Sequence, residues 1–282
     1  MSKLYFDCET GISGDMTVAA LLDLGADEEV LRKVLSGVKD DGFHIVIRRV
    51  KKAGIDCCDF DVVLDKDHEN SDHDMVYLYG GKDGVNSAEE PSGHTNIHNH
   101  HGHTHMNEHE HHGHRTLAEV LSIIDSLDMT DNARSIAKNT FDILAKAEAK
   151  AHGTTPEEVH FHEVGAIDSI VDIVSAAVCL DNLNVDGVIV TKLCDGQGTV
   201  RTRHGVLQIP VPAVMNIITD NGLKLEIRDR MGEYITPTGA AFAAATVTER
   251  ELPEGFVPVK VGLGAGKRDH EVPGILRAIL IE

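Results

Sequence analysis

Ten of the eighteen histidines in this chain lie between His94 and His114, in the run HTNIHNHHGHTHMNEHEHHGH. Neutral imidazole binds borderline divalent metals such as nickel, zinc and copper, so the run is predicted to gather a metal ion. Its composition fixes neither the metal nor a geometry. An alternative is a spacer with incidental affinity, which the irregular spacing disfavours. The predicted ligands are His98, His100, His101, His103, His105, His109, His111 and His112.

A second cluster of metal-binding residue types lies in HFHEVGAIDSIVD, residues 160–172. In an extended chain His160 and His162 project to one side, and Asp168 and Asp172 share one face of the helix that follows. Glu163 lies between the two groups. Together these side chains predict a metal site, or a site for a metal-bound phosphate. In isolation, such a pattern is more often a helix cap with surface hydrogen bonds.

The segment FDCETGISGDM, residues 6–16, predicts a strand, a tight glycine turn and the start of a helix. Free backbone N–H groups at a helix start suit an anion, with Ser13 and Gly14 as its binding residues. Asp7 or Asp15 would be available for a cation. The segment matches neither a P-loop nor a dinucleotide fingerprint. A glycine turn with an N-cap serine is the simpler interpretation.

Two further glycine-bearing loops have residue types that suit a phosphate group. ITPTG opens an alanine-rich helix, and GLGAGKRD places a Lys-Arg pair beside three glycines. Flexible glycines next to cations can cradle an anion, although hairpin turns have the same composition. Arg201, Arg203 and His204 form another basic cluster, for which a solvated strand face is the simpler interpretation. The predicted binding residues in the two loops are Thr236, Thr238, Gly239, Gly264, Lys267 and Arg268.

The elements that must position these residues alternate between strands and helices. Apolar spacing and capping residues predict helices at 13–24, 27–36, 117–127, 130–151 and 165–183, with two more starting near Pro212 and Pro237. Thr155–Glu158 predicts a further helix start, because proline follows a capping-box threonine. Strands are predicted at residues 3–7 and in FHIVIRRV, IDCCDFDVVL, GVIVTKLC, GTVRTR, LKLEI, PVKVGL and ILRAILI. This alternation predicts an α/β fold, a mixed sheet with flanking helices.

The composition of residues 65–114 differs sharply from the rest of the chain. Between Asp65 and Glu90 there are eight acidic residues against two lysines, and the histidine run follows. A segment this polar has too little apolar surface to offset its ordering entropy, so it is predicted to be disordered without metal. The predicted organisation is one α/β domain, residues 1–64 and 115–282, interrupted by an acidic and His-rich insertion at 65–114.

Bulk properties exclude several classes of function. The net charge of −20, the 4% aromatic content and the absence of tryptophan argue against a nucleic-acid-binding protein. No uncharged apolar stretch approaches the roughly twenty residues of a membrane helix, and MSKLYFDCETG lacks the pattern of a secretory signal. The five cysteines form no CxxC pair. We therefore expect reduced thiols and a cytoplasmic location. No arrangement of residues suggests covalent catalysis.

Taken together, four segments resemble the N-terminal part of the nickel-insertion proteins of the lactate-racemase system. They are FDCETGISGDM, LAKAEAKAHGTTPEEVHFHEVGAIDSIVDIV, ITPTGAA and GLGAGKRD. Their order and spacing match from residue 3 to the end of the sequence, and the His-rich insertion occupies the same place. The long match over residues 144–174 is the most specific part. One departure is Glu9-Thr10, which replaces a more usual aromatic-small pair before the GISGDM turn.

The resemblance implies an activity. Members of that family are CTP-dependent chelatases (cyclometallases, of the lyase class), which insert nickel into pyridinium bisthiocarboxylic acid mononucleotide to form the nickel-pincer nucleotide of lactate racemase. The implied cofactors are nickel and CTP with manganese or magnesium. Full-length members continue for about another domain, to which the nucleotide site is largely attributed. The implied partner is therefore a C-terminal nucleotide-binding domain or polypeptide, and we also expect a homo-oligomer.

The resulting hypothesis is a relay. The imidazole run raises the local nickel concentration by tethering and passes the ion to the site at residues 160–172. Glu163, Asp168, Asp172 and Asp15 are the candidate catalytic groups, one of which would remove the ring proton. One alternative is a non-catalytic nickel store or metallochaperone. Another is a metal-dependent phosphohydrolase that uses the Asp7/Asp15 and Asp168/Asp172 carboxylates.

Overall fold

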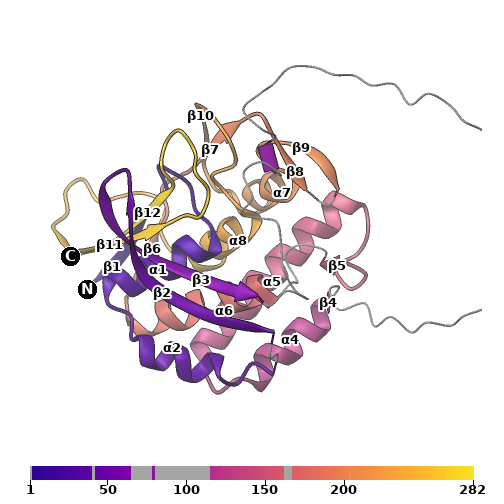
Figure 1. Cartoon of the computed structure of the whole chain (residues 1–282), viewed down its shortest axis with the longest axis horizontal. Coiled ribbons are helices and arrows are strands. Elements are labelled where there is room, and N and C mark those ends of the chain that lie inside the picture. The colour runs from indigo at the N-terminus through magenta and orange to yellow at the C-terminus, as the bar shows by residue number, and fades with distance from the viewer. Residues whose placement is uncertain (1, 40–41, 65–77, 80–114, 162–166, 203) are drawn as a thin grey trace, which may run out of the picture.

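The computed structural model describes residues 2–39, 42–64, 78–79, 115–161, 167–202 and 204–282 (Figure 1). Six strands form the central sheet: β1 (Lys3–Asp7), β2 (Phe43–Lys52), β3 (Ile55–Leu64), β6 (Gly187–Ile189), β11 (Pro258–Ala265) and β12 (Ile275–Ile281). Their order is β2-β3-β11-β12-β1-β6. The β1–β6 and β3–β11 pairs are parallel and the other pairs are antiparallel. The predicted mixed α/β sheet is therefore confirmed.

Three two-stranded sheets lie apart from the central one. β7 (Leu193–Gln197) pairs in parallel with β10 (Leu225–Met231), and β8 (Thr199–Thr202) forms a hairpin with β9 (Gly205–Gln208). β4 (Arg115–Thr116) pairs with β5 (His160–Phe161). The single strand predicted for GVIVTKLC is wrong, because its first half joins β1 as β6 and its second half joins β10 as β7.

The helices begin and end close to the predicted positions. They are α1 (Gly14–Leu24), α2 (Glu28–Leu35), α4 (Leu117–Ser126), α5 (Asp131–His152), α6 (Ile167–Asn182), α7 (Pro212–Asn221) and α8 (Pro237–Thr246). Ser13 caps α1, because its hydroxyl accepts from the Met16 N–H, and Thr130 caps α5 in the same way. The helix start predicted at Thr155–Glu158 is wrong. It forms a single turn, in which the Glu158 and Val159 N–H groups both donate to the Thr155 carbonyl, before the chain enters β5.

The sheet, α1, α6 and α5 contact one another in that order (Figure 1). α1 lies against β3, β11 and β12, and α6 lies against α1 and α5. α5 in turn contacts α7 and α8. The close approach of α1 to β11 requires glycine in the strand, since a Cβ on Gly262 would lie 2.1 Å from the Ala20 carbonyl oxygen and one on Gly264 would lie 2.0 Å from that of Met16.

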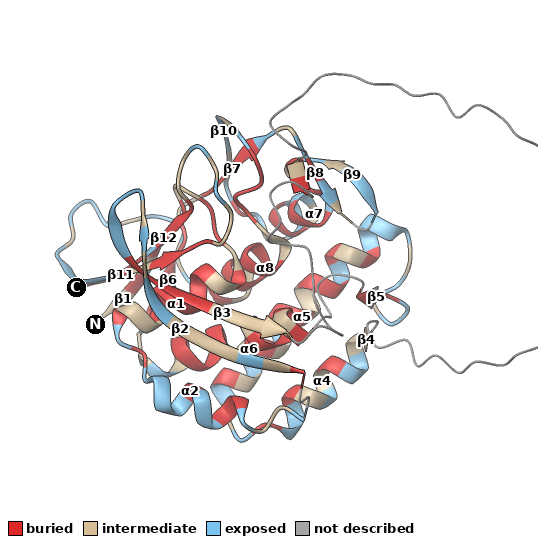
Figure 2. Cartoon of the chain, in the orientation of Figure 1, coloured by how far each residue is buried: buried red, intermediate tan, exposed pale blue. Residues whose placement is uncertain are grey.

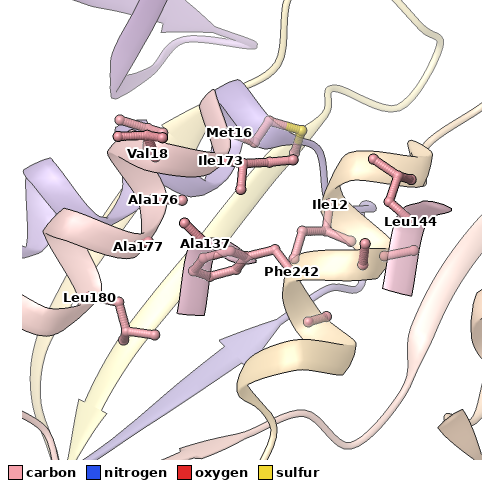
Figure 3. Close-up of a cluster of buried hydrophobic side chains, with 14 of the residues drawn as sticks. Ile12, Met16, Val18, Ala137, Leu144, Ile173, Ala176, Ala177, Leu180 and Phe242 are labelled. Carbon is pink, nitrogen blue, oxygen red and sulfur yellow. The ribbon is translucent and has the colours of Figure 1, made fainter. Parts of the chain in front are cut away.

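Small and branched apolar side chains fill the space between these helices. Ile12, Met16, Ile173 and Phe242 come from the start of α1, from α6 and from α8, and all lie in one cluster (Figure 3). α1 and α6 are buried along most of their length, whereas α2 and α4 keep an exposed face (Figure 2). The loops that enter α1 and α8 are therefore fixed by a packed core. Among the described helices, none combines the length and apolarity needed to cross a bilayer.

Two residues of the 65–114 insertion belong to the folded part. Leu78 is 4% exposed and lies in the core. The Tyr79 hydroxyl accepts from the Glu233 N–H at 3.1 Å. The expectation of disorder was too broad for these two, because the short apolar run MVYLY was averaged with its acidic surroundings. The histidine run lies outside the described residues.

Candidate functional site

A cavity of about 430 Å³ opens among α1, α6, α8 and the loops that precede them. Asp15 from the first turn of α1 lines it together with Asp168 and Asp172 from the first half of α6. All three carboxylates are half-buried. The structure therefore brings Asp15 together with Asp168 and Asp172.

Local contacts hold the three aspartates in place. Asp15 accepts a hydrogen bond from the Ser13 hydroxyl, and Asp168 accepts from the Ser169 N–H at 2.8 Å. Asp172 packs directly on the start of α1, since a Cβ on Gly14 would lie 2.6 Å from its Oδ2 atom. Gly14 is thus required for the approach of the Asp172 carboxylate to the helix N-terminus.

The surroundings of Asp172 favour its protonated form. Burial raises the pKa of this carboxyl well above its usual range, and the negative charges of Asp15 and Asp168 raise it further. Lys267 acts in the opposite direction, but more weakly. A carboxyl group with a raised pKa is suited to take up a proton near neutral pH.

The predicted anion cradle at Lys267 and Arg268 is already occupied by carboxylates of the chain. Both residues line the cavity, but the Lys267 ammonium pairs with Asp59 and, at 3.4 Å, with Asp61. Arg268 pairs with Glu233. The signal for the Lys267 pair was present in β3, where Asp59 and Asp61 lie two residues apart and so share a face. The sequence alone did not place β3 beside this loop.

The ITPTG loop contributes to the cavity in part. Thr236 and Thr238 line it, their hydroxyls lie 2.8 Å apart, and Thr236 also caps α8 by accepting from the Gly239 N–H at 3.2 Å. Gly239 and Gly264 do not line the cavity. Their predicted role in ligand binding gives way to packing, because a Cβ on Gly239 would lie 2.4 Å from the Ile12 carbonyl oxygen and Gly264 abuts α1.

One wall of the cavity is aromatic. The rings of Tyr234 and His270 have centroids 4.5 Å apart, and Tyr79 meets His270 edge-on at 5.5 Å. The Arg230 guanidinium lies 3.9 Å from the Tyr234 ring centroid. Burial and the charge of Arg268 lower the pKa of His270 to about 4, so its imidazole is neutral at neutral pH. Its Nε2–H donates to the Glu233 carbonyl at 3.0 Å.

Asp195 supports that wall from behind. Its Oδ1 atom accepts from the N–H groups of Gly196, Tyr234 and Ile235, whereas Oδ2 is buried without a partner. Burial raises the pKa of this carboxyl to about 6, despite the three hydrogen bonds. Nothing in the sequence DGQG distinguished Asp195 from an ordinary turn residue.

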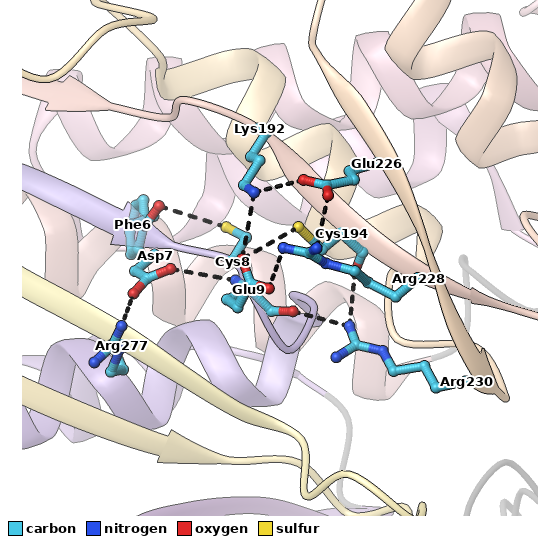
Figure 4. Close-up of polar contacts among 10 residues, drawn as sticks. All are labelled: Phe6, Asp7, Cys8, Glu9, Lys192, Cys194, Glu226, Arg228, Arg230 and Arg277. Carbon is cyan, nitrogen blue, oxygen red and sulfur yellow. Dashed lines mark hydrogen bonds and ion pairs between the residues drawn. The ribbon is translucent and has the colours of Figure 1, made fainter.

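The acidic residues before the GISGDM turn lie elsewhere. Asp7 pairs with Arg277, and Glu9 pairs with Arg228 and Lys192 in a cluster beside Cys194 (Figure 4). Neither Asp7 nor Glu9 lines the cavity. The Asp7/Asp15 pair of the phosphohydrolase hypothesis is therefore wrong, since only Asp15 reaches the site. Thr10 does line the cavity, and its hydroxyl donates to the Ile275 carbonyl of β12.

Other cavity residues were predicted for a different purpose or not at all. Arg201 and His204 are exposed, as a solvated strand face predicts, and they also line the cavity, while Arg203 lies outside the described residues. His162, Glu163 and the ligands predicted in the histidine run also lie outside them. The backbone of His160 pairs with Thr116 between β5 and β4. The lining residues that sequence reasoning missed include Asp61, Glu148, His152, Glu233, Tyr234 and His270.

The charge of the lining indicates what the cavity can hold. Lys267 and Arg268 are paired with Asp59 and Glu233, so Asp15 and Asp168 leave the part of the cavity between α1 and α6 acidic. In the described part of the chain, no group of three or more His, Cys, Asp or Glu residues is arranged to hold a metal ion. The site is thus an acidic chamber that attracts a cation, and not a finished coordination shell.

Comparisons with known proteins identify a family. A family model described as nickel insertion protein matches residues 4–282. A pyridinium-3,5-bisthiocarboxylic acid mononucleotide nickel insertion protein of Alkaliphilus metalliredigens is 47% identical over 281 residues, which is 100% of this chain and 61% of that protein. Proteins of the same description from Acetivibrio thermocellus and Lactiplantibacillus plantarum are 36% and 38% identical, over 99% and 100% of this chain and 60% and 62% of their own length. No solved structure matches.

Proposed function

Because the chain belongs to the nickel insertion protein family, we propose that it inserts nickel into pyridinium-3,5-bisthiocarboxylic acid mononucleotide to form the nickel-pincer nucleotide. The chain spans about 60% of the length of the curated relatives it matches. In this proposal it supplies the nickel-binding part of a chelatase of the lyase class. CTP, with manganese or magnesium, is bound largely by a separate C-terminal domain or polypeptide.

The observation that carries this proposal is the gathering of Asp15, Asp168 and Asp172 around one cavity. The volume of about 430 Å³ lies within the range of small-molecule sites. Carboxylate oxygens bind divalent metal ions, and imidazole nitrogens from His160 and His162 would complete a ligand set that suits nickel.

The cavity also suggests the order in which the substrates bind. The mononucleotide carries a phosphate and two thiocarboxylates, so it is an anion overall despite its pyridinium ring. An acidic cavity repels such a molecule until a divalent cation has entered. Nickel therefore binds first, and the thiocarboxylate sulfurs, which are soft ligands, then coordinate it. The mononucleotide phosphate would lie at Ser13, Gly14, Thr236 and Thr238.

Asp172 is the candidate for removing the ring proton. Nickel bonds to the ring carbon as the C–H bond of that carbon breaks, and a base must accept the proton. Burial and the negative charges of Asp15 and Asp168 raise the pKa of Asp172 well above its usual range. Bound nickel would lower that pKa again and leave the carboxylate ionised, ready to act as the base.

The test is an insertion assay with purified chain, mononucleotide, nickel and CTP. Product is followed by the absorbance of the nickel-pincer nucleotide, with and without the C-terminal part of a relative. Turnover that needs both parts supports a two-part enzyme, and turnover by this chain alone assigns the whole reaction to it. No product under either condition contradicts the proposal. Order-of-addition experiments should show faster product formation when nickel is added before the mononucleotide.

A second candidate is a nickel store or metallochaperone that acts through binding alone. The run of ten histidines favours it, because many imidazoles bind several ions without a chemical step. This candidate predicts that the chain binds nickel but forms no product, whether or not the aspartates at positions 15, 168 and 172 are present. We expect either activity in the cytoplasm, where the five thiols stay reduced.

A further inference from the structure

We propose that His152 and His204 form a nickel-binding site at the rim of the cavity, with Glu148 beside them. The inference deepens the proposed function, on which it rests, by adding a second nickel-binding site between solvent and the three aspartates. His152 ends α5 and His204 lies in the turn of the β8–β9 hairpin, so two distant parts of the sequence supply the pair (Figure 1).

The geometry of the pair suits one metal ion. The ring centroids of His152 and His204 are 4.7 Å apart, with an angle of 55° between the ring planes. Metal–nitrogen distances of roughly 2.0–2.1 Å allow two rings at this separation to bind the same ion after small side-chain rotations. The Glu148 Oε2 atom lies 3.6 Å from His152 Nε2 and supplies a carboxylate at the same place.

The chain ends that carry these side chains are fixed by glycine. Gly153 ends α5 with a φ of 68°, and Gly205 follows His204 with a φ of 99°. Glycine adopts this left-handed region without the steric cost of a Cβ. Both turns therefore hold their preceding histidine at the rim, where both residues are exposed.

The position and charge of these three residues indicate a cation that binds at the rim before it enters the cavity. Both histidines and Glu148 line the same cavity as Asp168 and Asp172, yet both imidazoles are exposed to solvent. In the described residues these three groups are not a preformed metal shell. Three ligands at an exposed rim bind an ion less tightly than a complete shell does, as transfer to the interior requires. The Glu148 carboxylate disfavours an anion at this position.

The site is tested in the full chain with the ten histidines of the 94–114 run replaced by asparagine, which removes their competing affinity. Nickel chloride is titrated at neutral pH and followed by calorimetry and by NMR of the histidine Cε1–H signals. Paramagnetic nickel should broaden the His152 and His204 signals at substoichiometric metal. His152→Ala and His204→Ala should each weaken binding about tenfold or more. The control His44→Ala, on the exposed face of β2, should bind as the parent does.

The outcomes separate this inference from the proposed function. Broadening of His44 together with the pair, or unchanged affinity in both alanine variants, overturns the rim site, as does tighter binding of inorganic phosphate than of nickel. In the insertion assay, both variants should raise the nickel concentration at half-maximal rate about tenfold or more. If the rim binds nickel but no chain forms product, the proposed function fails and the binding site stands. If Asp172→Asn abolishes insertion while rim binding persists, both hold.

Discussion

At the scale of single residues, the fold raises the pKa of two aspartates in and behind the cavity and lowers the pKa of one histidine. Asp172 and Asp195 are held toward their neutral, protonated forms because burial disfavours a carboxylate. His270 is held neutral because burial disfavours an imidazolium. Within the cavity, the negative charges of Asp15 and Asp168 act on Asp172 and raise its pKa further.

Asp172→Asn should reduce nickel insertion by about a hundredfold or more, a typical loss for a general base. Its midpoint of thermal unfolding should stay equal or rise, because asparagine cannot ionise between the negative charges of Asp15 and Asp168. Insertion assays and thermal melts check this. Asp142→Asn is the matched control, since Asp142 pairs with Lys146 on the exposed side of α5 and should leave activity unaltered. Wild-type activity in Asp172→Asn would contradict the assignment.

Asp195 predicts a pH dependence of stability. Its folded pKa of about 6 lies above the ordinary value of 3.8, so the folded chain binds this proton more tightly than the unfolded chain does. The free energy of unfolding should therefore fall as pH rises from about 4 to about 6, by up to roughly 3 kcal/mol from this group. Denaturant unfolding of wild type and Asp195→Asn across that window measures the difference. A pH-independent difference between the two would contradict the raised pKa.

At the scale of elements, the start of α1 organises the site. Ser13 caps the helix, Gly14 admits the Asp172 carboxylate, and Asp15 faces the cavity, all within one turn. The helix can present this turn only because β11 lets it lie close to the sheet, through the glycines at positions 262 and 264. The packing of α1 on β11 therefore determines where the first turn of α1 lies in the cavity.

Gly264→Ala tests this coupling. The added Cβ would lie 2.0 Å from the Met16 carbonyl oxygen, so α1 must shift, at a cost of about 1–3 kcal/mol in the free energy of unfolding. Gly255→Ala is the control, because a Cβ there meets nothing within 4 Å, and it should change stability by less than about 0.5 kcal/mol. Urea unfolding of the two variants provides the measurement. Equal stability of both would mean that Gly264 does not set the approach of α1.

At the scale of the whole molecule, an acidic chain carries the groups proposed to bind metal in two kinds of place. Ten histidines lie in one run of sequence, and the aspartates of the cavity come from segments about 150 residues apart. The net charge of −20 attracts divalent cations to both. We infer that collection and chemistry are separate tasks of separate segments.

Deleting residues 94–114 should lower the number of nickel ions bound per chain while leaving insertion intact at saturating nickel. The reason is that tethered ligands raise local concentration without taking part in the chemistry. Equilibrium dialysis gives the stoichiometry, and the insertion assay over a range of nickel concentrations gives the rate. A control replaces the run with a Gly-Ser linker of equal length. Loss of insertion even at saturating nickel would place the run in the chemistry.

Local pattern was sufficient for most elements of this fold. Capping residues, apolar spacing and terminal glycines gave the helices from α1 to α8 within a few residues, because these signals act over a single turn. Where the pattern failed, at GVIVTKLC and Thr155–Glu158, the outcome depended on partners elsewhere in the chain. β6 and β7 pair with different strands, and the chain at Thr155 must enter β5.

The sequence by itself determined the family, the α/β class and the residue types of the proposed nickel site, since these depend on motifs and local periodicity. Only the tertiary structure decided that Asp15 meets Asp168 and Asp172, that Lys267 and Arg268 are neutralised by Asp59 and Glu233, and that His152 lies beside His204. Each of these depends on which helix lies on which strand. Charge pairing and burial act through space, and distance along the chain does not specify them.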